Sequence, residues 1–71
     1  MGKYEVITVA EREISSPIVF NTFEEAHEEM EKQVYEILDG KELENYGEIG
    51  KDYAWLDDVY GNNFDFAIYK I

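Results

Sequence analysis

Two runs of hydrophobic positions in the first twenty residues, at 3–10 and 18–20, are separated by polar positions and have the composition of β-strands. Residues 3–10 are rich in β-branched and aromatic side chains, which favour a strand. Tyr4, Val6 and Thr8 would lie on one side of it, and the residues between them are also largely apolar, so we expect a central strand rather than an edge. A Ser-Ser-Pro turn signal separates it from a short second strand at 18–20, and a hairpin is the expected connection.

The strongest periodic pattern predicts an amphipathic helix over residues 22–39. Thr22 and Glu25 have the spacing of a capping box, a motif typical of helix N-termini. Gly40 follows the last apolar residue, where a left-handed C-cap is expected. Between these ends, apolar residues recur at helical spacing and form one stripe toward a core: Phe23, Ala26, Met30, Val34, Ile37 and Leu38.

The rest of the chain predicts a glycine-rich loop and a second hairpin. Residues 40–52 have no clear period, so we expect a mobile loop there, with at most one helical turn at 42–46. Residues 53–60 and 64–71 read as two strands, and Gly and Asn residues at 61–63 tolerate the positive φ of a tight turn.

The resulting element order, ββαββ, predicts a single α+β domain over residues 1–71. We expect a four-stranded, largely antiparallel sheet with one amphipathic helix packed on one face, and the strand order stays open. The other face of the sheet would meet solvent or a partner, where Tyr and Trp side chains are useful at an interface.

The chain is strongly acidic, and most of the excess negative charge lies in the predicted helix and the loop after it. The chain has 17 Asp and Glu against 6 Lys and Arg, a formal net charge of −11, and residues 21–50 alone hold ten acids and two bases. Such a field repels phosphate backbones and anionic membranes and favours basic partners. We therefore expect a basic protein surface as the partner, with no direct binding of nucleic acid or membrane.

The acidic side of the helix and the loop after it form the candidate partner-binding surface. One explanation of such a charge run is a solvated face that keeps the protein soluble, and the other is electrostatic docking. Like charges four residues apart destabilise an isolated helix, which makes selection for negative charge plausible. The candidate binding residues are Glu24, Glu25, Glu28, Glu31, Tyr35, Glu42 and Glu44.

No catalytic, metal or cofactor signature accompanies these residues. His27 is the only histidine, lies within the apolar arc and has no nucleophile or second acid nearby, so we expect it to pack. The acid-rich stretch 57–65 lacks the spacing of an EF-hand, because Val59 and Gly61 occupy ligand positions. Asp57 and Asp58 would point to opposite faces of a strand. We expect no enzyme activity, no metal and no cofactor.

Three observations bear on location. The absence of cysteine fits a reducing cytoplasm. The first residues contain no basic segment followed by a longer apolar run, so no signal peptide is expected. No apolar stretch approaches the roughly 18 residues of a membrane span. Together they predict a cytoplasmic protein.

Three segments resemble short acidic hypothetical proteins of gut bacteria and their mobile elements: Phe23-Glu24-Glu25-Ala26, Ala54-Trp55 and Asn63-Phe64-Asp65-Phe66-Ala67-Ile68. This resemblance implies no activity and no functional residues. In size and charge the chain is also similar to small acidic phage proteins, which include inhibitors of restriction and CRISPR nucleases that imitate the charge of DNA.

The leading hypothesis is a small acidic protein-interaction module without enzyme activity. Its sharpest form is a phosphate-mimicking inhibitor of a basic nucleic-acid-binding protein. The alternative is a self-associating structural or accessory domain, such as a homodimer, whose acidic face serves only solubility.

Overall fold

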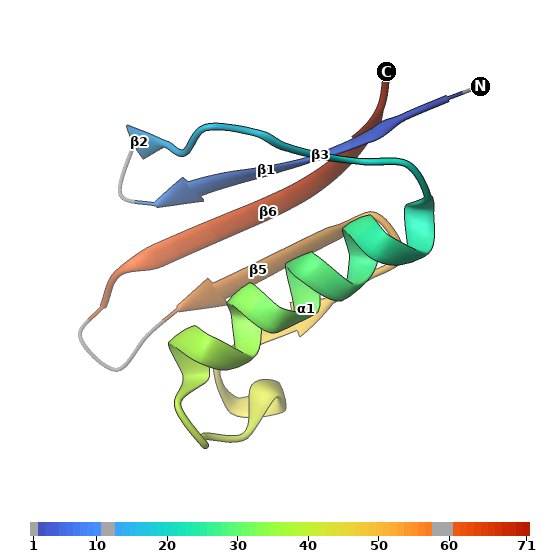
Figure 1. The fold of residues 1–71 in the computed structure, drawn as a ribbon. Coiled ribbons are helices and arrows are strands. Elements are labelled where there is room, and N and C mark those ends of the chain that lie inside the picture. The colour runs from blue at the N-terminus through green and yellow to red at the C-terminus, as the bar shows by residue number, and fades with distance from the viewer. Residues whose placement is uncertain (1, 11–12, 58–60) are drawn as a thin grey trace.

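One antiparallel sheet carries a single α-helix on one of its faces (Figure 1). The structure is a computed structural model that describes residues 2–10, 13–57 and 61–71. The strands follow the order β2-β1-β6-β5-β4, and β3 also pairs with β1. In chain order the elements are β1 (Tyr4–Ala10), β2 (Glu13–Ile14), β3 (Ile18–Phe20), α1 (Phe23–Leu38), the 3₁₀ helix η1 (Leu43–Asn45), β4 (Gly47–Ile49), β5 (Tyr53–Asp57) and β6 (Asn63–Lys70).

The predicted α+β class and the helix on one sheet face are confirmed, but the strand count is wrong. The sheet has six strands rather than four, because β2 and β4 are additional. In the region 40–52, expected as a mobile loop with one helical turn at 42–46, η1 provides that turn, and β4 is an unexpected strand after it. The strand expected at 53–60 ends at Asp57 in the described part of the chain, and residues 58–60 lie outside the described residues.

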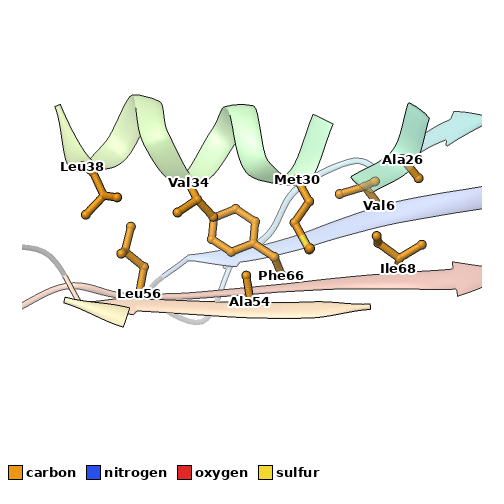
Figure 2. Close-up of a cluster of buried hydrophobic side chains, with 9 residues drawn as sticks. All are labelled: Val6, Ala26, Met30, Val34, Leu38, Ala54, Leu56, Phe66 and Ile68. Atoms are coloured by element: carbon orange, nitrogen blue, oxygen red, sulfur yellow. The ribbon is translucent and has the colours of Figure 1, made fainter. Parts of the chain in front are cut away.

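The core lies between α1 and the covered face of the sheet (Figure 2). The helix contributes a buried residue every four positions, and β1, β5 and β6 contribute alternate residues from their inner side. Burial of each large side chain stabilises the fold by about 1.5–3 kcal/mol. The buried residues are Val6, Ala26, Met30, Val34, Leu38, Ala54, Leu56, Phe66 and Ile68.

Both ends of α1 lie within one residue of their predicted positions. Thr22 is the N-cap, and its Oγ1 accepts a hydrogen bond from the Glu25 backbone N–H at 3.1 Å, as predicted. The left-handed C-cap is Asp39, with φ 49°, one residue before the expected Gly40. Within the described ranges, no helix is long and apolar enough to cross a membrane.

The opposite face of the sheet has no helix over it in the part of the chain that the structure describes (Figure 1). We call it the open sheet face. Side chains alternate along a strand, so the neighbours of the buried strand residues point to this face. They include Trp55 and Tyr69, which are 43% and 54% exposed. Exposed Tyr and Trp side chains therefore lie on the uncovered face.

Candidate functional site

The N-terminal half of α1 carries a group of carboxylates on the side that faces away from the core. We call Glu24, Glu25, Glu28 and Glu29 the acidic helix surface. The buried residues Ala26 and Met30 alternate with these acids at helical spacing, so the same periodicity that builds the core turns the acids outward. Glu24 and Glu25 lie in the first turn, where the helix dipole favours negative charge.

Two hollows flank this part of the helix, and Glu28 borders both. One is about 400 Å³ and is lined by Phe23, Glu24, His27, Glu28 and Lys51. The other is about 230 Å³ and is lined by Phe20, Glu25, Glu28, Glu29 and Lys32. Each hollow therefore combines an aromatic ring, two or more carboxylates and one lysine.

His27 anchors the first flank to the turn between β4 and β5. Its Nε2 lies 3.1 Å from the Gly50 carbonyl oxygen, and its Nδ1 lies 2.7 Å from Glu31 Oε1. The Gly50 carbonyl oxygen and the Glu31 carboxylate are both hydrogen-bond acceptors, and each faces one of the two ring nitrogens. The His27 side chain is 26% exposed. The expected packing role is thus combined with two polar contacts that fix the wall of the larger hollow.

A chain of side-chain hydrogen bonds fixes the second flank to the sheet. Thr8 Oγ1 donates to Gln33 Oε1 at 2.6 Å, and Gln33 Nε2 donates to Glu29 Oε2 at 2.8 Å. Strand β1 thereby positions a carboxylate of the acidic helix surface through Gln33. A carboxylate held in this way needs less ordering when a cation binds to it.

The structure separates the predicted binding residues into three groups. Glu24 and Glu28 are exposed and border the hollows. Glu25 and Glu31 also have structural roles, because Glu25 accepts from Thr22 Oγ1 at 3.1 Å and Glu31 contacts His27. The remaining predicted residues lie toward or beyond the C-terminal end of α1: Tyr35, which is 52% exposed, and Glu42 and Glu44, which flank the start of η1.

Comparison with protein-family models, with curated proteins and with solved structures found no match. The side chains themselves therefore supply the argument for function. Among the described residues, no group of three or more His, Asp or Glu is arranged to hold a metal ion. Asp58, considered with Asp57 in the sequence, lies outside the described residues.

Sequence reasoning missed the apolar and basic parts of this site. The sequence places Phe20 in a strand and Phe23 in the core stripe, and neither pattern indicates that these rings border hollows. Lys51 comes from the turn between β4 and β5, 23 residues after Glu28, so no local spacing could have placed it there. Lys32 is the exception, because its position one helical turn after Glu28 places it beside these acids from the sequence alone.

A separate electrostatic feature lies on the open sheet face, where the Tyr53 hydroxyl donates to Glu48 Oε2 at 2.8 Å. The hydrogen bond and the negative charge of Glu48 both favour the protonated phenol, so the pKa of Tyr53 is raised above its ordinary value of about 10. Because the pKa is higher in the folded state, this contribution to stability is complete below about pH 10 and is lost as pH rises through the folded pKa.

We expect Tyr53 to ionise at a lower pH in Glu48→Gln than in the native protein, because the variant lacks the carboxylate charge. Carbon-13 NMR of tyrosine labelled at Cζ measures this titration residue by residue. Glu36→Gln, which removes a charge from α1, is the matched control and should leave the Tyr53 titration unchanged. An identical titration in Glu48→Gln and the native protein would contradict the assignment.

Proposed function

We propose that this protein is an interaction module without enzyme activity that docks onto a basic protein surface through its acidic helix surface. The observation that supports this most is the pair of hollows on either side of Glu28, each with a phenylalanine and carboxylates. A lysine or arginine can lay its apolar stem against the ring while its charged end reaches the carboxylates. Two basic side chains from one partner would enter the two hollows together.

Electrostatic docking of this kind acts mainly on association rate and on partner choice. The net charge of −11 attracts basic surfaces over several ångströms and repels acidic ones. Screening by salt weakens the attraction between exposed charges. Affinity should therefore fall steeply as ionic strength rises, a behaviour that separates this function from burial of apolar surface.

Inhibition of a nucleic-acid-binding protein by phosphate mimicry is the sharpest form of the proposal. Glu24 and Glu28 lie one turn apart, about 6 Å along the helix axis, but Lys32 interrupts the row before Glu36. This short carboxylate row favours occupation of a small phosphate-binding pocket over imitation of a long duplex.

The proposed compartment is the cytoplasm, in keeping with a chain that has no cysteine.

The test compares capture by two double variants of equal charge. Glu24→Lys/Glu28→Lys changes the acidic helix surface, and Glu36→Lys/Asp57→Lys changes exposed acids elsewhere. Each pair replaces two charges of −1 by +1 and takes the net charge from −11 to −7. The baits are incubated with lysate of the organism that carries the gene, at about 50 mM and about 500 mM salt, and captured proteins are identified by mass spectrometry.

We expect a basic protein to be captured by the native bait at low salt and released at high salt. With that partner purified, Glu24→Lys/Glu28→Lys should weaken binding by about tenfold or more, and the control pair should have a much smaller effect. If the partner also binds nucleic acid, the native protein should compete with it. If both double variants lose the same affinity for the partner, binding depends on net charge alone, and the proposed site is contradicted.

Self-association through the open sheet face is the second candidate function. It is favoured by the exposed apolar side chains on that face, among them Ile14, Val19 and Trp55. Sedimentation velocity distinguishes the two functions. A dimer that persists at high salt supports self-association, whereas a monomer supports the docking function.

A further inference from the structure

The open sheet face combines apolar side chains with carboxylates in neighbouring strands. One row across the sheet places Trp55 of β5 beside Asp65 of β6, and Asp65 beside Val9 of β1, which in turn pairs with Ile14 of β2. The next row places Tyr53 beside Ala67, and Ala67 beside Ile7. Asp65 is thus exposed in the middle of an apolar and aromatic surface.

A shallow hollow of about 360 Å³ lies beside this carboxylate. Its lining includes Ile7, Val9, Ile14, Asp65, Ala67 and Tyr69. Ile14 is 71% exposed, more than any other large apolar residue of the described chain. The described strand residues of this face include no lysine or arginine. Lys3, just before β1, is the nearest described base along that strand.

We propose that the open sheet face binds an amphipathic helix of a partner protein, one that presents an arginine beside aliphatic side chains. Trp55 and Asp65 are direct cross-strand neighbours. A guanidinium group can stack on the indole ring and donate two parallel hydrogen bonds to the adjacent carboxylate. Aliphatic side chains of the same helix would fill the hollow beside Asp65.

The geometry of the face favours a helix over an extended segment. The main-chain groups of β1, β5 and β6 are paired within the sheet, so an added strand could pair only with an edge. A helix, by contrast, packs across a sheet face through side chains alone, as α1 does on the covered side. The occupied protein would then have helices on both sides of one sheet.

Charge disfavours a second copy of this chain as the occupant. Each copy has a net charge of −11, and its helix α1 has an acidic outer side. Packing α1 of one copy on the sheet of another would set glutamates against Asp65. Packing sheet on sheet would bring the carboxylates of Glu5, Glu48 and Asp65 of both copies together.

The open sheet face and the acidic helix surface lie on opposite sides of the sheet (Figure 1). This proposal therefore does not rest on the proposed function of the acidic helix surface. Binding at one surface can fail while binding at the other is retained, and residue-resolved mapping separates the two results.

The test uses helical peptides selected from a phage-displayed library on the immobilised native protein. Synthetic copies of the enriched peptides are then titrated into nitrogen-15-labelled protein. We expect the enriched sequences to contain an arginine one helical turn from aliphatic residues, and the amide shifts to map to β1, β5 and β6. Trp55 is the only tryptophan, so a blue shift of its fluorescence should accompany binding.

Two exposed positions allow variants that leave the core intact. Asp65→Asn and Ile14→Ser should each weaken the peptide by about tenfold, through loss of the charged contact and of the apolar contact. Glu36→Gln removes the same charge from α1 and should change the affinity by less than about twofold. Circular dichroism checks that all three variants stay folded.

Three results would overturn the proposal. The first is enrichment of peptides without arginine, or no enrichment at all. The second is binding that Asp65→Asn and Ile14→Ser leave unchanged, or amide shifts that map to α1. The third is a dimer of the native protein in sedimentation velocity that Ile14→Ser abolishes, because the occupant of the face would then be a second copy.

Discussion

Phe66→Ala is expected to destabilise the fold by about 3–5 kcal/mol. Phe66 lies in β6 between Thr8 and Ala54, whose small side chains leave room for its ring. The ring rises toward Met30 and Val34 of α1 and is only 2% exposed (Figure 2). A domain of 71 residues has a free energy of unfolding of about 4–11 kcal/mol, so this loss is a large part of the total.

The matched control for this substitution is Tyr69→Ala. Tyr69 is also an aromatic residue of β6, but it points to the open sheet face and is 54% exposed. We expect Tyr69→Ala to lower the free energy of unfolding by less than about 1 kcal/mol. Urea denaturation followed by far-UV circular dichroism gives both free energies of unfolding. Equal costs for the two variants would mean that the helix does not depend on the Phe66 ring for its packing.

The longer elements could be predicted because each carries its own pattern. The apolar residues of α1 repeat at helical spacing, and the alternation in β6 fixes which of its sides is buried. Strand β1 is recognised instead by its run of β-branched and aromatic residues. Strands β2 and β4 are only two and three residues long, too short for any period. They are defined by the neighbouring strands, since β2 pairs with the end of β1 and β4 with β5.

The candidate site was predictable only in part, for a related reason. The helix period places Glu24 and Glu28 on an outer side without any knowledge of the fold. The contacts that shape the two hollows join residues far apart in sequence. Thr8 and Gln33 are 25 residues apart, and His27 and Gly50 are 23 residues apart. Such pairs depend on the register of the sheet under the helix, which a single sequence does not reveal.

Gly47→Ala is expected to destabilise the protein by about 1–3 kcal/mol, although it adds only one methyl group. A Cβ at Gly47 would overlap the backbone carbonyl oxygen of Trp55 and lie 3.0 Å from Leu56 Cα. These are backbone atoms of the paired strand β5, so they can yield only if β4 moves away from it. The Asp57 N–H donates to the Tyr46 carbonyl oxygen at 2.8 Å beside this contact, and its hydrogen exchange should become faster.

Gly50→Ala is the matched control for Gly47→Ala, because its added methyl group would meet a side chain rather than backbone. A Cβ at Gly50 would overlap the ring of Tyr53, which is 45% exposed and can rotate into solvent. We expect this variant to cost less than about 1 kcal/mol and to break the Tyr53–Glu48 hydrogen bond without changing exchange at Asp57. If Gly47→Ala costs no more than Gly50→Ala, the close approach of β4 to β5 is incorrect. If Gly47→Ala costs more and the Asp57 amide hydrogen exchanges faster, the absence of a side chain at Gly47 is what allows β4 to pair closely with β5. No periodic pattern in the sequence indicates that role.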